Sequence, residues 1–158
     1  MTKRIVRRKG QQPLGFASPL LARILSSRGV VNADDLDHSL KGLLAPDSLL
    51  GIGKAAKMLA EGLETDSSIL IVGDFDADGA TSCTLMVTAL RAMGARQVNY
   101  LVPDRFKFGY GLTPEIVDVS VQFKPDVIVT VDNGIASVEG VAHANTLGIS
   151  VVVTDHHL

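Results

Sequence analysis

Apolar and polar residues follow one another in two different ways along this chain, and the change falls near residue 66. Before it, short apolar groups recur with the spacing of amphipathic helices. After it, compact apolar runs alternate with helical segments. The pattern therefore predicts a basic tail and helical extension over residues 1–66 and a separate α/β domain over residues 67–158.

Three short helices are expected in the extension. The first begins after Ser18, because serine followed by proline is typical of a helix N-terminus, and it ends before Gly29. The second is expected to start near Asn32, and the third covers residues 52–64. The apolar face of the third helix is predicted to contain Ala55, Ala56, Leu59, Ala60 and Leu63.

Four apolar runs in the second part have the composition of buried strands. They are residues 69–72, 98–102, 126–131 and 149–154. Helical segments separate these runs over residues 80–93, 113–123 and 136–147. Strands that alternate with helices form right-handed crossovers, so we predict an α/β fold with a parallel β-sheet flanked by helices.

Composition excludes several classes of protein. Of the 158 residues, 46% are hydrophobic, which is enough to form a buried core. The only cysteine, Cys83, excludes a disulfide framework and a thiolate metal cluster. No apolar run approaches the roughly 20 residues that span a membrane. With no signal peptide visible either, we expect a cytoplasmic protein and no membrane partner.

The net charge of −2 conceals an uneven distribution. Residues 1–28 contain seven lysines and arginines and no acid, which leaves eight basic and seventeen acidic side chains in the remaining 130 residues. The basic cluster is compatible with a solvated tail or with nucleic-acid contact. Thirteen of the acids are aspartates, although glutamate is the better helix former. This excess indicates turns, helix caps and metal ligands.

Carboxylate and imidazole residues follow three of the four predicted strands. Asp74, Asp76 and Asp78 follow the first strand, residues 132–134 (Asp-Asn-Gly) follow the third, and residues 155–157 (Asp-His-His) follow the fourth. Ligands of open parallel sheets bind beyond the carboxyl ends of the strands. Carboxylates crowded there would repel one another unless a cation bound between them. Oxygen and imidazole ligands without thiolate favour Mn²⁺ or Mg²⁺.

Each motif taken alone has another interpretation. The run that starts at Asp74 resembles a calcium loop, but position 12 of that loop would be Leu85 instead of glutamate. It also resembles the opening of an aspartyl-phosphate phosphatase, although Asp78 or Ala80 stands where a threonine or valine is expected. Residues 132–134 alone would be interpreted as a turn. No Gly-x-x-x-x-Gly-Lys-Ser/Thr phosphate loop is present.

Taken together, the three motifs resemble those of the DHH phosphoesterase superfamily. The matching segments are residues 73–79, 131–134 and 154–157. The resemblance implies a Rossmann-like parallel β-sheet flanked by helices, as in the N-terminal part of a DHH domain. It also implies a hydrolase that uses two metal ions, Mn²⁺ or Mg²⁺, to cleave phosphodiester or phosphoanhydride bonds.

Further segments resemble one branch of this superfamily, the 5′→3′ exonucleases that are specific for single-stranded DNA. These segments are residues 27–30, 41–44, 101–106 and 109–112. The resemblance implies hydrolysis of single-stranded DNA from the 5′ end in DNA repair or recombination. Single-stranded DNA and repair or recombination proteins are therefore the expected partners, and no nucleotide cofactor is expected.

The superfamily motifs also imply roles for individual residues. The implied catalytic residues are Asp76, Asp78, Asp132, His156 and His157. All five are implied metal ligands, and Asp132 resembles the carboxylate that two ions share. Many relatives carry a histidine where this chain has Val72, so we expect Asp74 to supply a further ligand. Asp155 is expected to orient the histidines, and Asn133 to support the ligands without binding an ion.

DNA contacts are expected around this centre. Gly79 and Gly134 form tight turns that let backbone N–H groups approach a phosphate. Arg105 and Lys107 follow the second strand, where they belong either to a solvated loop or to a contact with the DNA backbone. The aromatic residues nearby, which offer a stacking face, are Phe106, Phe108 and Tyr110.

The chain ends one residue after the third motif, whereas the resemblance implies a further aspartate from a fourth motif. We therefore expect an N-terminal fragment that binds metal weakly and is itself nearly inactive. Two alternative functions share these motifs. One is a DHH phosphodiesterase acting on short oligonucleotides or cyclic dinucleotides, and the other is a non-catalytic DHH-like scaffold.

Overall fold

A computed structural model describes residues 14–157 of the chain. Most of the N-terminal basic cluster lies outside these residues. Contacts divide the chain into two units, Met1–Leu49 and Leu50–Leu158, which are described separately. The second unit carries the sheet and the candidate site.

Within residues 14–49, the first unit has one α-helix followed by single helical turns. Helix α1 covers Pro19–Ser26, which confirms the helix expected after Ser18. The second predicted helix is only a 3₁₀ turn, η1, over Asp34–Leu36. Asn32 accepts a hydrogen bond from the Asp35 N–H, and Asp35 accepts one from the Asn32 N–H, so the two residues form a local cap. Two further 3₁₀ turns, η2 and η3, cover Leu40–Gly42 and Pro46–Ser48.

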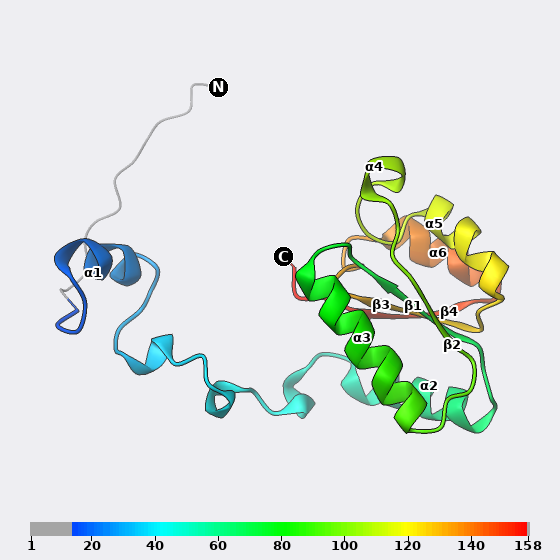
Figure 1. Cartoon of the computed structure of the whole chain (residues 1–158), viewed down its shortest axis with the longest axis horizontal. Helices are drawn as coiled ribbons and strands as arrows, with labels where there is room; N and C mark the ends of the chain where they lie inside the picture. Colours follow the sequence, from blue (N-terminus) through cyan, green and yellow to red (C-terminus); the bar gives the residue numbers. More distant parts are fainter. Residues whose placement is uncertain (1–13, 158) are drawn as a thin grey trace. The chain divides into compact units, whose positions relative to one another are not determined.

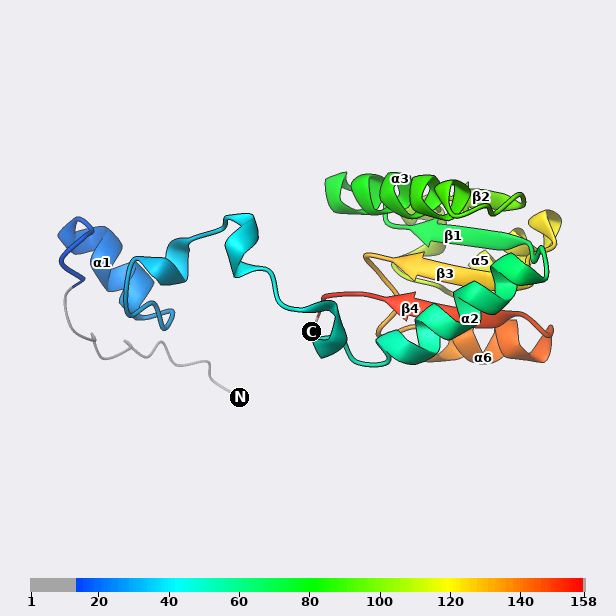
Figure 2. The same cartoon turned by 90° about the horizontal axis from the view of Figure 1, so that it is seen from below.

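Four parallel strands form the sheet of the second unit. Strands β1 (Ile69–Gly73), β2 (Val98–Leu101), β3 (Val127–Val131) and β4 (Ser150–Thr154) match the four predicted runs closely. Their order is β2-β1-β3-β4, and Figure 2 shows them side by side in that order. The predicted α/β fold with a parallel sheet is therefore confirmed.

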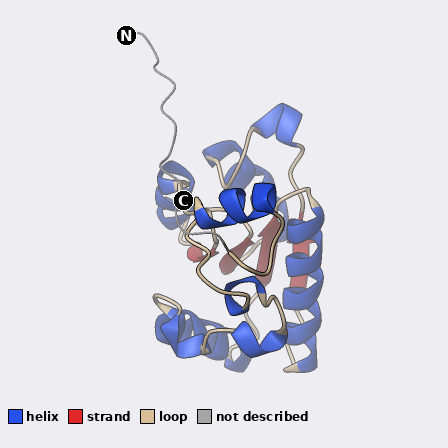
Figure 3. Cartoon of the chain, turned by 90° about the vertical axis from the view of Figure 1, so that its left-hand side faces the viewer, coloured by secondary structure: helices blue, strands red, loops and turns tan. Residues whose placement is uncertain are grey.

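Helices cover both faces of this sheet (Figures 1 and 3). Helices α2 (Ile52–Glu64) and α3 (Ala77–Ala92) pack on the face to which Ile69 and Ile71 point. Helices α5 (Pro114–Ser120), with the 3₁₀ turn η4 (Val121–Phe123) behind it, and α6 (Val138–Thr146) pack on the face of Leu70 and Val72. Because successive side chains of a strand point to opposite faces, β1 is buried along its whole length. Of the helices in residues 14–157, none has both the length and the apolar character of a membrane span.

Helix α2 has the predicted bounds but a rotated buried face. The residues that pack against the sheet are Ala55, Met58 and Leu59. Ala56 and Ala60, which the apolar spacing placed on the buried face, are exposed. The larger side chain of Met58 contacts the core where an alanine would not reach it. Helix α2 packs on the sheet, and contacts place it in the second unit, which begins at Leu50.

Two other elements differ from the sequence-based expectations. Helix α3 begins at Ala77, three residues earlier than predicted, because the Asp76 side chain caps its N-terminus. A four-residue helix, α4 (Arg105–Phe108), stands in the segment expected to be a loop, and Asp104 caps it in the same way. Each helix start is set by its own aspartate side chain. Asp76 accepts two backbone N–H groups, and Asp104 accepts one.

The helical connections change from one face of the sheet to the other at its centre. Strands β1 and β3 are neighbours, but the helix that follows β1 covers one face and the helix that follows β3 covers the other. This divergence opens a crevice beyond the carboxyl ends of the two strands, where ligands of such sheets bind. The fold therefore directs the residues after β1 and β3 into one crevice.

We expect Gly140→Ala, inside α6, to destabilise the protein. A Cβ at this position would overlap the backbone carbonyl of Leu112, which cannot move away as a side chain can. Overpacking of this kind costs about 1–3 kcal/mol of unfolding free energy. The matched control is Gly53→Ala in α2, where no atom lies within 4 Å of the added methyl group. Urea unfolding of both variants checks the prediction, and equal stabilities would contradict it.

Candidate metal centre

The loop after β1 is folded around Asp76. One oxygen of its carboxylate, Oδ1, accepts the N–H groups of Asp78 and Gly79, both at 3.1 Å. The Gly79 hydrogen bond contributes most to lowering the pKa of the Asp76 carboxyl. A side chain at position 79 would collide with the backbone of Asp74, so only glycine permits this turn.

Asp74 forms an ion pair with the arginine that follows β2. Its Oδ2 lies 2.6 Å from Nη2 of Arg105, and the Asp74 side chain is only 10% exposed. The guanidinium group of Arg105 also lies 4.1 Å from the centre of the Phe75 ring and 5.2 Å from that of Tyr110. Arg105 therefore contacts the acidic crevice from its place in α4, although its side chain is 40% exposed.

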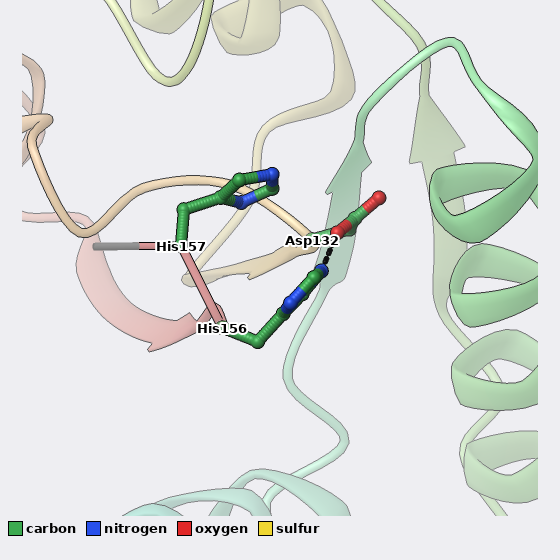
Figure 4. Close-up of side chains that lie close together, drawn as sticks. All are labelled: Asp132, His156 and His157. Atoms are coloured by element: carbon green, nitrogen blue, oxygen red, sulfur yellow. Dashed lines mark hydrogen bonds and ion pairs between the residues drawn. The ribbon is translucent and has the colours of Figure 1, made fainter. Parts of the chain in front are cut away.

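Asp132 is held in an uncommon conformation at the end of β3. Its φ of 62° lies in the left-handed region, which few residues other than glycine adopt. Its N–H donates to the carbonyl of Thr154, and its own carbonyl accepts a hydrogen bond from the Tyr110 hydroxyl. The buried carboxylate lies 2.9 Å from Nε2 of His156. Figure 4 shows the two side chains pointing toward each other. Asp132 thus connects the ends of two strands with the loop that contains Tyr110.

Asp155 orients the two histidines through hydrogen bonds to its carboxylate. Its nearly inaccessible carboxylate accepts the N–H groups of His156, His157 and Ile135 at 2.7, 3.1 and 2.9 Å. Nδ1 of His157 lies 2.7 Å from the same carboxylate. Burial alone would raise the pKa of Asp155, but these hydrogen bonds outweigh burial and lower it to about 2. The ionised carboxylate in turn raises the pKa of the His157 imidazole.

Two groups of ligand-type side chains meet at Asp132. One contains Asp132, His156 and His157, and the other contains Asp74, Asp76 and Asp132. Within each group the ligand atoms lie within 4.8 Å of one another. Carboxylate oxygens and imidazole nitrogens at these separations suit a divalent cation such as Mn²⁺. The donor set therefore fits two adjacent cations with Asp132 between them.

Asp78 stands apart from both groups. It is exposed, and it lines a cavity of about 330 Å³ together with Thr81, Ser82 and His156. Asp132 also lines this cavity, so Asp78 lies at the edge of the centre and not inside it. The structure brings five of the six predicted ligands into the two groups, and Asp78 reaches them only across the cavity.

The predicted DNA-contacting residues are distributed unevenly. Arg105 lies at the centre, whereas Nζ of Lys107 lies over the Phe108 ring at 4.9 Å. Phe106 is 98% exposed, and Phe108 packs against the core. Gly134 has a φ of 115°, and a side chain there would collide with Thr130, so this glycine is needed for its backbone conformation.

Tyr110 has a role that sequence analysis missed. Its hydroxyl lies 3.0 Å from Nδ1 of His157 and donates to the carbonyl of Asp132. Burial contributes most to raising the pKa of this hydroxyl, which keeps it protonated as a donor. Gly109 and Gly111, both with positive φ, return the loop to the crevice. These two glycines were the available signal in the sequence.

Comparison with known proteins identifies the family. The family model described as "DHH family, N-terminal domain" matches residues 68–158, more than half of the chain. This chain belongs to the DHH family. The resemblance expected from the three motifs is therefore confirmed.

Relatives of this DHH-family chain share most of its length. It is 54% identical over 140 residues to the single-stranded-DNA-specific exonuclease RecJ of Salmonella typhimurium and covers 24% of that protein. It is 44% identical over 159 residues to RecJ of Haemophilus influenzae and covers 28% of it. These alignments include 89% and 99% of this chain. The chain thus spans about a quarter of the length of the curated relatives it matches.

Solved structures agree with the fold of the DHH-family chain. A crystal structure of exonuclease RecJ bound to manganese matches with a TM-score of 0.66 at 37% identity, over 73% of this chain and 30% of that one. RecJ of Thermus thermophilus in complex with Mn²⁺ matches with a TM-score of 0.63 at 33% identity, over 89% of this chain and 19% of that one. Both relatives are RecJ proteins, as the exonuclease-like segments predicted.

We expect Asp155→Asn to lower the pKa of His157 toward 6.5, the value of a histidine without a partner. A raised imidazole pKa stabilises the folded state below pH 6.5, and that stabilisation is lost as the pH rises through the raised value. The variant should lack this pH dependence. Histidine-ring NMR titrations measure the shift, with Asp118→Asn as the control because Asp118 pairs with His143 instead. An unchanged His157 midpoint in Asp155→Asn would contradict the role of Asp155.

Proposed function

We propose that this chain forms the metal-binding part of an enzyme that hydrolyses phosphodiester bonds of single-stranded DNA from the 5′ end. The observation that carries the proposal is the pair of ligand groups that share Asp132 at the central crevice. Identity of 54% to a relative named as a single-stranded-DNA-specific exonuclease supports the substrate. The alternatives, a short-oligonucleotide phosphodiesterase and a non-catalytic scaffold, are not favoured by these relatives.

Mn²⁺ or Mg²⁺ is the proposed cofactor, with two ions in the complete enzyme. The ligands would be Asp74, Asp76 and Asp132 on one side and Asp132, His156 and His157 on the other. When bound, such ions lower the pKa of a water molecule and neutralise the charge of the phosphate. Asp78 is proposed as a ligand at the edge of the same centre, across the cavity that it lines.

The protein groups hold the ligands in place. His156 Nε2 and Asp132 Oδ1 are 2.9 Å apart, which lets both atoms face the same ion. Asp155 and Tyr110 both lie within hydrogen-bonding distance of Nδ1 of His157. Nε2 is therefore the nitrogen through which His157 would reach an ion or the phosphate. The catalytic set proposed for this chain is Asp76, Asp78, Asp132, His156 and His157.

Arg105 is the proposed contact to the DNA backbone beside the ions. Its guanidinium group lies 2.6 Å from the Asp74 carboxylate and against the rings of Phe75 and Tyr110. A phosphate bound near Asp74 would lie within reach of this group. Contacts of Lys107, Gly79 and Gly134 with DNA stay predictions. So do the cytoplasmic location, the repair or recombination protein partners and the lack of a nucleotide cofactor.

A chimera with a relative of this chain tests the proposed activity. The aligned segment of RecJ of Escherichia coli, 52% identical over 140 residues, would be replaced by the corresponding residues of this chain. We expect the chimera to release nucleotides from 5′-labelled single-stranded DNA with Mn²⁺, in preference to duplex DNA or dinucleotides. Asp132→Asn in the chimera should lower the rate by at least about a hundredfold, because it removes the shared ligand.

Asp66→Asn is the matched control for this loss. Asp66 and Asp132 both have positive φ, which asparagine tolerates, but Asp66 pairs with Arg96 at the opposite end of the sheet. A correctly folded chimera that is inactive on single-stranded DNA, or an active Asp132→Asn chimera, would contradict the proposal.

We expect Arg105→Met to weaken binding of single-stranded DNA by the Mn²⁺-loaded chimera, because one phosphate contact is lost. Binding should also become less dependent on salt, with a change in the logarithmic slope of about 0.7. Arg96→Met is the control, since Arg96 forms a comparable ion pair, with Asp66, away from the centre. Fluorescence anisotropy at several salt concentrations measures both effects. Equal slopes for the Arg105 and Arg96 variants would remove Arg105 from the DNA contact.

A further inference from the structure

Asn133 joins the ends of the two central strands through its side chain. It follows Asp132 directly and is 2% exposed. Its Nδ2 donates to the carbonyl of Val131 at 2.9 Å and to the carbonyl of Val72 at 3.1 Å. Val131 is the last residue of β3, and Val72 is the last but one of β1. One amide group therefore uses both of its N–H donors to connect the two strands.

This connection lies where the sheet itself stops. The register of β1 with β3 ends with the pair Gly73 and Val131. The residues that follow these two strand ends are Asp74 and Asp132, which belong to one ligand group. The distance between these carboxylates thus depends on how firmly the strand ends are held just before them.

The acceptor oxygen of the same side chain, Oδ1, does not explain why an amide stands at this position. Oδ1 of Asn133 is buried and has no hydrogen-bond partner within the described structure. Asn133 lines a cavity of about 10 Å³ with Asp74 and Arg105, which is close to the space one water requires. A buried acceptor without a protein partner is unfavourable, and leucine of similar size would avoid it. The side chain is therefore explained by its two donors.

We propose that Asn133 is a positioning residue that sets the separation of the two halves of the metal centre. It holds Asp132, directly after β3, at the distance from Asp74 and Asp76, after β1, at which all three would face one ion. The inference rests on the divalent-metal centre of the proposed function. It adds that the geometry of this centre is determined by one amide that does not itself bind metal.

Mn²⁺ titration of the full chain, followed by electron paramagnetic resonance, tests the role of Asn133. Asn133→Leu removes both donors and also the unpartnered acceptor. Because the carbonyls of Val72 and Val131 lose this donor, we expect the melting temperature to fall while the protein stays folded. Mn²⁺ affinity should fall by about tenfold or more, as it does when groups that orient ligands are lost. The control is Thr130→Val, because Oγ1 of Thr130 is also buried and unpartnered but connects no strands. This control should bind Mn²⁺ like the wild type.

The outcomes separate this inference from the proposed function. If the wild type does not bind Mn²⁺, the metal centre itself is wrong. If the wild type binds and Asn133→Leu binds within twofold of it, only the positioning role is overturned. If the leucine variant unfolds, Asn133→Ser, which keeps one donor, is measured against the same two criteria. Unfolding of both variants would overturn the inference, because it would show a requirement for folding.

Discussion

Pairing of β1 with β3 brings together the carboxylates of Asp74, Asp76 and Asp132, on which the candidate centre depends. The two strands are in register from Ile69 with Val127 to Gly73 with Val131, so their backbone hydrogen bonds bring both carboxyl ends to the same level. The helices that follow cover opposite faces of the sheet, and ligands of such sheets bind at this point, beyond the strand ends. Pairing of β3 with β4 then delivers Asp155 and the two histidines to the same edge.

This concentration of acids is stabilised by hydrogen bonds before any ion is considered. Asp76 accepts two backbone N–H groups, and Asp155 accepts three. Asp74 is paired with Arg105, and Asp132 with His156. Each carboxylate thus has a partner that fixes its direction, which reduces the reorganisation needed to bind a cation. The centre is preorganised by the fold and by local capping.

Much of this arrangement follows from sequence, and the exceptions have physical reasons. The strand runs 69–72 and 126–131 were predicted almost to the residue, because β-branched residues buried on both faces leave a clear pattern. That strand ends converge is a rule of parallel sheets, so Asp74, Asp132 and His156 were found together. The buried face of α2 was predicted only in part. Ala55 and Leu59 pack against the core as expected, but alanines at helical spacing mark two overlapping faces equally well. The hydrogen bonds from Tyr110 to Asp132 and from Asn133 to Val72 join residues 22 and 61 positions apart, and they depend on loop geometry that spacing along the chain does not encode.

The central claim is that the shared carboxylate of Asp132 lies between two divalent ions at the crevice of β1 and β3. Anomalous diffraction at the manganese edge, from crystals of the chain grown with Mn²⁺, locates such ions directly. The account predicts two peaks within coordination distance of Asp132, one on the side of Asp74 and Asp76 and one on the side of His156 and His157. Manganese bound elsewhere, with no peak in contact with Asp132, would contradict it.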